Sequence, residues 1–159
     1  KVFRFEVLEL KREYPMRPIV GVGAVILQDG KLILVKRRAE PGKGRWSIPG
    51  GSVHLGEKVR DATIRESKEE TGLDVEIVDE RPLDAFDSII KDDRGRTQYH
   101  FTLLEFLVKP KGGTLKAAED ASEARWVPLD EVKKYDLTSS FRTFFEKHEN
   151  ELKRLSSSQ

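Results

Sequence analysis

Four glutamates follow a pair of glycines in this sequence, at a spacing that suits metal-assisted chemistry. The stretch Gly51–Leu73 reads GSVHLGEKVRDATIRESKEETGL, and its glutamates are Glu57, Glu66, Glu69 and Glu70. If the second half of this stretch is helical, Glu66 and Glu70 lie one turn apart on the same side. Carboxylate oxygens are hard ligands of the kind that magnesium and manganese prefer. The spacing therefore predicts a site for a divalent cation.

A helical wheel over residues 58–71 supports this interpretation. At about 100° per residue, the glutamates share one arc with small and apolar residues rather than with the cations. The residues on this arc are Val59, Ala62, Thr63, Glu66, Glu69 and Glu70. Glu69 has Arg65 four residues before it, but the positions three and four residues from Glu66 hold no cation. Like charges at this spacing repel by about 0.2–0.5 kcal/mol per pair, so a bound cation would offset the repulsion, whereas a solvated acidic face is the alternative.

The longer pattern resembles the signature of the Nudix family, hydrolases that cleave nucleoside diphosphates linked to another group. Every fixed residue of that signature is present at its spacing: Gly51, Glu57, Arg65, Glu66, Glu69, Glu70, Gly72 and Leu73. Ser67 is the departure, because the family usually carries a large aliphatic residue there, and this bears on how tightly the helix packs. The resemblance implies an α/β fold, an α/β/α sandwich with a mixed β-sheet, and a magnesium-dependent reaction in which manganese could replace magnesium.

The resemblance also implies roles for the acidic residues. Glu66, Glu69 and Glu70 would hold the metal together with the backbone carbonyl of Gly50, and the cation would then orient the phosphates and activate water. Glu57 would be an outer ligand or hold a water molecule. Arg65 would hold Glu69 in place from the second layer of the site.

A further carboxylate is expected from a loop that several relatives place near the metal. Glu119 and Asp120 are the candidates for it in this sequence. The identity of the general base stays open between Glu69, Glu70 and this loop carboxylate.

Other residues are candidates for contact with the substrate. Arg37 ends an expected strand, where it could be an ordinary charged terminus, but the resemblance implies contact with substrate phosphates or base, and a guanidinium suits bidentate contact. Gly50 and Gly51 allow unusual φ angles and let the backbone approach a ligand closely. Trp46 is interpreted as a core residue, with stacking on the substrate base as the alternative. His100, beside a strand, is given no catalytic role.

The elements that must position these residues follow from the apolar pattern. Strands are expected at residues 19–27, 31–37, 74–78, 82–90, 99–108 and 125–127. The run IVGVGAVIL suits a strand buried on both faces, and Asp29-Gly30 predicts a tight hairpin after it. Helices are expected at 58–71, ending at Gly72, then at 129–132 and at 139–155. The segment Pro110–Gly113 is expected to break the sheet.

Length and composition fit one domain of 159 residues. We expect an N-terminal arm or edge strand at 1–17, which makes a homodimer plausible, a single Nudix-type domain at 18–155 and a frayed tail at 156–159. The net charge of +1 gives no bias toward nucleic acid, and no apolar run is long enough to span a membrane. The absence of cysteine excludes disulfides and thiolate chemistry and is compatible with the cytoplasm.

Three segments favour one branch of the family. RPIVGVGAV, GKGRWSIPGG and DASEARWVPL are similar to those of ADP-ribose pyrophosphatases, which implies hydrolysis of ADP-ribose to AMP and ribose 5-phosphate. A house-cleaning nucleoside triphosphatase acting on oxidised nucleotides is the alternative within the same class. A module that senses a nucleotide without cleaving it is the alternative from another class, and the complete set of acidic residues argues against it.

Overall fold

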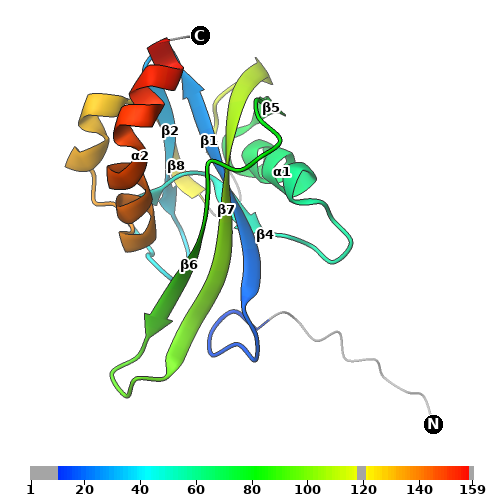
Figure 1. Cartoon of the computed structure of the whole chain (residues 1–159), viewed down its shortest axis with the longest axis vertical. Helices are drawn as coiled ribbons and strands as arrows, with labels where there is room; N and C mark the ends of the chain where they lie inside the picture. The colour runs from blue at the N-terminus through cyan, green and yellow to red at the C-terminus, as the bar shows by residue number, and fades with distance from the viewer. Residues whose placement is uncertain (1–10, 118–120, 158–159) are drawn as a thin grey trace.

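The computed structural model describes residues 11–117 and 121–157. A mixed β-sheet lies between two helices, α1 (Val59–Thr71) and α2 (Ser139–Ser157), which cover opposite faces (Figure 1). The predicted α/β class and the α/β/α arrangement are therefore confirmed. None of the helices in the described ranges is long and apolar enough to cross a membrane.

The sheet branches from its first strand. Its strands are β1 (Ile19–Gln28), β2 (Lys31–Arg37), β3 (Trp46–Ser47), β4 (Gly50–Ser52), β5 (Leu73–Ile77), β6 (Asp84–Lys91), β7 (Thr97–Gly113) and β8 (Ala121–Pro128). The central order is β3-β2-β1-β7-β5, and β4, β6 and β8 pair with β1, β7 and β2. The pairing of β1 with β7 is parallel, whereas β1 is antiparallel to β2 and β4. The short strands β3 and β4 were not expected from the sequence.

Alternate residues of β1 face two different cores, as the prediction of a strand buried on both faces requires. Val25 and Leu27 pack with the phenylalanines of α2, whereas Ala24 and Ile26 pack with Ala62 of α1. Removing this apolar surface from water on both faces holds the helices to the sheet. The backbone of β1 is thereby fixed, and with it the strands that line the site.

The predicted tight turn after β1 is confirmed. Gln28 pairs with Lys31, and Asp29 and Gly30 between them both have positive φ, at 51° and 73°. Two central residues with positive φ are what a type I′ hairpin turn needs. The 3₁₀ helix η1 (Leu129–Lys134) lies beside this turn, with the N–H of Leu129 donating to the carbonyl of Gly30.

The predicted break of the sheet at Pro110–Gly113 is wrong. β7 continues through this segment, where Val75 of β5 pairs with Pro110 and Leu73 pairs with Gly113. Proline lacks an N–H, and it is tolerated here because the register shifts beside it, between Asp74 and Val75. β8 is also longer than the expected 125–127 segment, since it pairs with β2 along the whole of that strand.

Helix α1 ends as predicted at Gly72, which has φ 76°. Its inner face carries small polar residues whose hydroxyls are satisfied within the helix. Ser67 is fully buried, and its hydroxyl donates to the carbonyl of Thr63 at 2.8 Å. The serine at the family's aliphatic position therefore brings α1 close to the sheet without leaving a buried hydroxyl unpaired.

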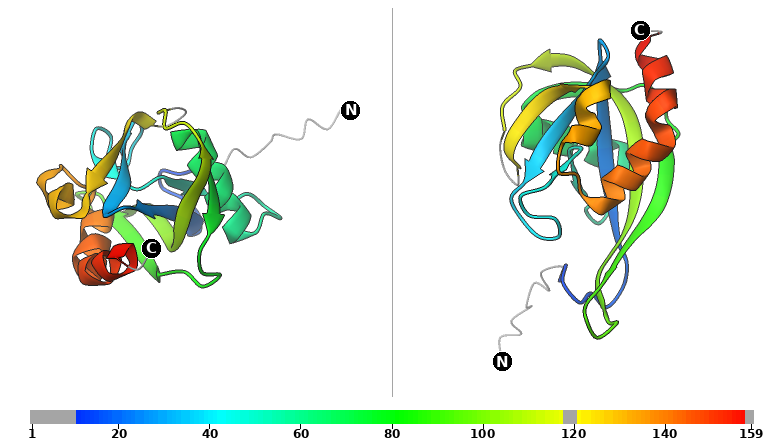
Figure 2. Two further views of the ribbon diagram at one scale, coloured as in Figure 1. Left: turned by 90° about the horizontal axis from the view of Figure 1, so that it is seen from above. Right: turned by 90° about the vertical axis from the view of Figure 1, so that its left-hand side faces the viewer.

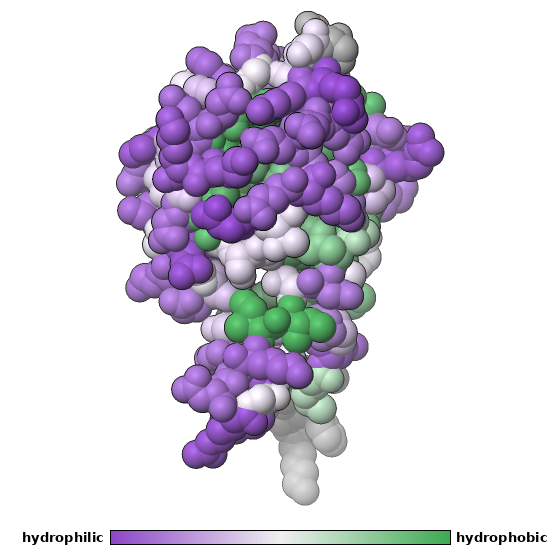
Figure 3. Space-filling view, turned by 60° about the vertical axis from the view of Figure 1, so that its left-hand side comes forward, coloured by the Kyte–Doolittle hydropathy of each residue, from purple (hydrophilic) through white to green (hydrophobic). Residues whose placement is uncertain are grey.

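The C-terminal helix is longer than expected, whereas the N-terminal arm or edge strand stays a prediction. α2 continues to Ser157, because the hydroxyl of Ser156 accepts a hydrogen bond from the N–H of Gly30 at 2.6 Å. Of the expected arm, residues 1–10 lie outside the described ranges, and 11–17 run beside the β6–β7 hairpin, where Tyr14 donates to Asp92. This hairpin extends beyond the helices (Figure 2). Figure 3 shows a largely hydrophilic face with an apolar patch at its narrower part.

Candidate active site

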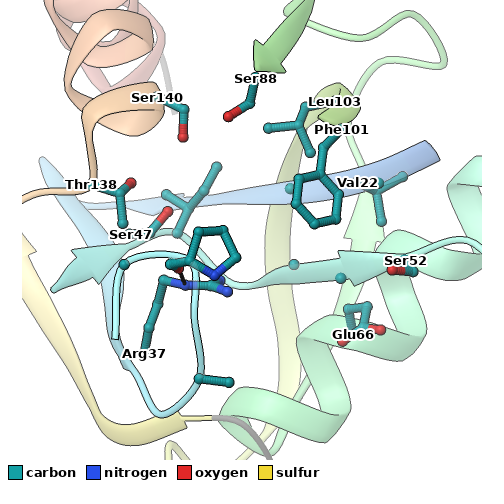
Figure 4. Close-up of a pocket in the computed structure, with 18 of the residues that line it drawn as sticks. Val22, Arg37, Ser47, Ser52, Glu66, Ser88, Phe101, Leu103, Thr138 and Ser140 are labelled. Carbon is teal, nitrogen blue, oxygen red and sulfur yellow. Dashed lines mark hydrogen bonds between the residues drawn. The ribbon is translucent and has the colours of Figure 1, made fainter. Parts of the chain in front are cut away.

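One pocket of about 770 Å³ brings together residues from distant parts of the sequence. Glu66 and Glu70 of α1, Gly50 and Gly51 of β4, and Arg37 of β2 all line it. In Figure 4, Glu66 and Arg37 lie on opposite sides of the pocket, and Phe101 and Leu103 lie along another side. A volume of this size accommodates a nucleotide-sized ligand, for which about 300–1,000 Å³ is typical.

Arg65 is the centre of the carboxylate network. Its Nε and Nη2 donate to the two oxygens of Glu57 at 2.8 and 2.9 Å. Its Nη1 donates to Glu66 at 2.7 Å and to Glu69 at 3.1 Å, and Nη2 also donates to the carbonyl of Ser52. Arg65 was expected to hold Glu69, and in the structure it joins Glu69 to two further carboxylates and ties the helix to β4.

The expectation that Glu66 has no cation beside it is wrong. The helical wheel considers residues three and four apart, whereas Arg65 is the adjacent residue and its long side chain turns back over Glu66. The same guanidinium explains the electrostatics of its partners, because hydrogen bonding to Arg65 lowers the pKa of Glu57 to about 2. The pKa of Arg65 is in turn raised by Glu57.

Glu66, from the Arg65 network, and Glu70, outside it, are the two carboxylates of α1 that line the pocket. Both are buried, whereas the side chain of Glu69 is 43% exposed and Glu69 does not line the pocket. Glu70 accepts a hydrogen bond from the N–H of Gly50 at 3.2 Å. Glu57 accepts from the N–H of His54 and holds the turn before α1. The pocket-facing pair is thus the one whose spacing first indicated a metal site.

Space, rather than an unusual φ, explains the two glycines before the helix. A Cβ atom at Gly51 would lie within 2.7 Å of both carboxylate oxygens of Glu66, and one at Gly50 would overlap the carbonyl of Val22. Neither glycine has positive φ, so the expected need for unusual backbone angles does not apply here. Glycine at 51 lets the carboxylate of Glu66 reach the strand.

This donor set fits a hard divalent cation. Within the described ranges, no three or more His, Asp or Glu side chains converge into a closed metal site. Magnesium commonly takes only one or two carboxylates, keeps several waters and binds substrate phosphates as well. Glu66 and Glu70, which line the pocket with Gly50 and Gly51, form an open set of that kind.

Substituting Gly51 with alanine tests this arrangement. We expect the new methyl group to displace the carboxylate of Glu66 and to lower kcat by about 10²-fold, since displacing a catalytic group by about 1 Å has this effect. Steady-state kinetics measures the change. Gly112→Ala is the control, because a Cβ atom there would meet only Asp74, at 3.7 Å, and its activity should stay near that of the wild type. Equal activity of the two variants would contradict the assignment.

The Glu57–Arg65 pair predicts a stability that depends on pH. The pKa of Glu57 falls from an ordinary 4.5 to about 2, so its contribution to the free energy of unfolding is complete above 4.5. That contribution is lost as the pH falls toward 2, where the folded form is protonated as well. Urea titrations should show wild type more stable than Glu57→Gln at neutral pH, with the gap closing in acid. A constant gap would rule out the ion pair as its cause.

Of the other residues expected to contact the substrate, Arg37 lines the pocket and Trp46 does not. Arg37 lines the pocket, and its Nε donates to the carbonyl of Pro41 at 2.7 Å. Trp46 is 7% exposed and packs in the core against Tyr135, with Arg125 over its ring. It does not line the pocket, so stacking of Trp46 on a substrate base is not supported. Glu119 and Asp120 lie outside the described residues.

Several pocket residues were missed by the sequence reasoning. Among them are Arg12, Ser88, Phe101, Leu103, Glu105, Thr138, Ser139 and Ser140. Most belong to β6, β7 and the start of α2, which approach the site only through the tertiary fold. Glu105 alone carried a signal, because it is the one charged residue in the apolar run FTLLEFLV.

Similar proteins of known sequence or structure identify the family of this chain. The family model of the Nudix domain matches residues 17–148 of this chain. An ADP-ribose pyrophosphatase from Methanocaldococcus jannaschii is 37% identical over 134 residues, which cover 84% of this chain and 75% of the relative. The crystal structure of a MutT Nudix hydrolase from Burkholderia pseudomallei has a TM-score of 0.69 at 31% identity, covering 82% of this chain and 97% of that one.

A second solved structure is that of a larger enzyme, and this chain is similar to part of it. It is a bifunctional NMN adenylyltransferase/ADP ribose pyrophosphatase from Francisella tularensis, in complex with AMP and a manganese ion. Its TM-score is 0.65 at 27% identity, and the match covers 86% of this chain and 42% of that one. The domain match and the relative found over most of the sequence lead to one conclusion. This chain belongs to the Nudix family and is a pyrophosphohydrolase.

Proposed function

We propose that this protein hydrolyses the pyrophosphate bond of ADP-ribose with the help of a divalent metal ion, giving AMP and ribose 5-phosphate. The observation that carries the proposal is the pair Glu66 and Glu70, buried at one end of a pocket of nucleotide size. The similarity to an ADP-ribose pyrophosphatase over most of the chain supports this choice of substrate.

Glu66 and Glu70 would hold a magnesium or manganese ion, with the carbonyl of Gly50 as a further ligand. When bound, the ion supplies charge neutralisation of the pyrophosphate and activation of water. Glu69, which is 43% exposed and pairs with Arg65, is a third candidate ligand. Its release from Arg65 would be needed for that role.

The chain's own residues position the reacting groups. Arg65 orients Glu66 through a hydrogen bond of 2.7 Å and holds Glu57 with two more. Glu57 would stay ionised and hold water or act as an outer ligand, because its pKa is about 2. The general base is one of Glu69, Glu70 and the carboxylates of Glu119 and Asp120, and its water must lie within hydrogen-bonding distance.

Arg37 would bind the substrate from the side of the pocket opposite Glu66. Its hydrogen bond to Pro41 directs the guanidinium along the pocket wall (Figure 4). A planar guanidinium can donate two hydrogen bonds to one phosphate, which suits the diphosphate of the substrate. We therefore propose that Arg37 contacts the phosphates or the base.

Product analysis over a substrate panel tests the proposed function. ADP-ribose, 8-oxo-dGTP and diadenosine polyphosphates are incubated with the protein and magnesium, and the products are separated by chromatography. AMP with ribose 5-phosphate supports the proposal. A nucleoside monophosphate with pyrophosphate would instead identify a house-cleaning triphosphatase. Tight nucleotide binding without turnover under any divalent metal would identify a sensing module.

The assembly and the location of the protein stay predictions. A homodimer would give twice the mass of the chain in light scattering, and a monomeric mass would reject it. A cytoplasmic location would be checked by cell fractionation.

A further inference from the structure

Glu105 is a buried carboxyl group in the wall of the pocket that the proposed mechanism does not use. It lies on β7, it is 5% exposed, and it lines the same pocket as Glu66 and Glu70. Its Oε2 atom is buried without a hydrogen-bond partner among the described residues. A buried polar atom without a partner is destabilising, so a carboxyl group in this position indicates a use.

The carboxyl group of Glu105 fits because the neighbouring strand has a glycine, without a side chain, at position 23. Gly23 of β1 pairs directly with Glu105 of β7. A Cβ atom at Gly23 would lie 2.6 Å from the carboxyl carbon of Glu105 and 2.9 Å from Ile48. The carboxyl group thus occupies the space that any other residue at position 23 would fill.

The surroundings of Glu105 favour its neutral form. Burial raises the pKa of Glu105 to about 8, and the charge of Asp84 adds to the effect. Asp84 lies opposite on β6 and is itself held by His148 and Lys147 of α2. A neutral carboxyl group offers one hydrogen-bond donor beside one acceptor, whereas an ionised one only accepts.

The rest of this end of the pocket is suited to a flat, largely apolar group. Leu103 and Phe101 continue the same face of β7 (Figure 4), and the side chain of Ile48 approaches Gly23 as that of Glu105 does. The arginines that line the pocket, Arg37 and Arg12 over the ring of Phe101, can bind a phosphate, whereas Glu105 offers it no positive charge. The carboxylates proposed for the metal lie on α1. A nucleobase fits, because it presents apolar faces and a polar edge.

We propose that Glu105 determines the choice of base by binding the edge of adenine. Its carboxyl O–H donates to the ring nitrogen, and its carbonyl oxygen accepts from the adjacent exocyclic amine. This inference rests on the proposed function, since it names the residue that selects an adenine nucleotide.

Binding measurements without turnover test the inference. AMP and purine riboside monophosphate, which lacks the amine, are titrated by calorimetry into wild type, E105Q and E105M. Wild type should bind AMP about tenfold more tightly than purine riboside monophosphate, as expected for one net hydrogen bond. E105Q keeps a donor beside an acceptor and should preserve that ratio. In E105M the ratio of the two affinities should fall close to one. This variant should also have a melting temperature no lower than that of wild type, since a buried group without a partner is removed.

The control is L103M, which changes the same face of β7 without a polar group. It should change both affinities together and leave their ratio intact. An unchanged ratio in E105M, a loss in E105Q as large as in E105M, or no binding of AMP by wild type would each overturn the inference. If the ratios behave as expected but ADP-ribose is not cleaved, the proposed substrate is wrong and the role of Glu105 stands.

Discussion

Glu70→Gln is expected to lower kcat for ADP-ribose hydrolysis by about 10³-fold while leaving the fold intact. The amide keeps the shape of the side chain and can still accept the hydrogen bond from Gly50. It removes the negative charge that would hold the cation, and with it several kcal/mol of transition-state stabilisation, each about 1.4 kcal/mol being tenfold in rate. Steady-state kinetics with saturating magnesium measures the loss.

The same variant should lose its response to metal. Magnesium raises the melting temperature of a protein that binds it only when folded, so wild type should be stabilised by magnesium and Glu70→Gln much less so. Glu76→Gln is the matched control, because Glu76 is an exposed carboxylate on β5 that pairs with Lys109. Near-normal turnover by Glu70→Gln would refute its assignment as a ligand.

Arg65→Ala is expected to reduce both activity and stability. Glu57, Glu66 and Glu69 would lose their shared cation, and loss of such a supporting residue costs about 10–100-fold in activity or metal affinity. Removing one partner of a fully buried pair costs about 3–5 kcal/mol, and we expect about 2–3 kcal/mol here because 22% of the Arg65 side chain is exposed. Kinetics and urea unfolding measure the two effects.

Arg60→Ala is the control for this change. Arg60 lies on the same helix, but it faces outward and pairs with Glu80, which is 82% exposed. Surface pairs of this kind contribute about 0–1 kcal/mol, so both activity and stability should stay close to those of wild type. If the two arginine variants behaved alike, the network around Arg65 would have no special role.

Local patterns in the sequence were sufficient for much of the fold. The apolar run of β1, the Asp29-Gly30 turn and the glycine that ends α1 each act over a few residues, and each was predicted correctly. The end of β7 was not, because Pro110 is a strong local breaker. Its pairing with β5, which lies far away in sequence, outweighs that preference.

The candidate site likewise has features that follow from local sequence patterns and features that do not. The spacing of Glu66 and Glu70 follows from helical geometry and could be derived, and both residues line the pocket. The contact of Arg65 with Glu66 depends on where a long side chain turns, which residue spacing does not determine. Glu105 and its neighbours enter the pocket through the parallel pairing of β1 with β7, a contact that no local pattern encodes.

The fit of Glu105 over Gly23 has a consequence for how this protein can vary in evolution. Neither position can change freely, because a larger residue at 23 would expel the carboxyl group, and a shorter residue at 105 would leave a void against the strand. The two positions should therefore covary among relatives. Relatives in which Gly23 is replaced are expected to lack Glu105 as well, and therefore to lack the preference for one base.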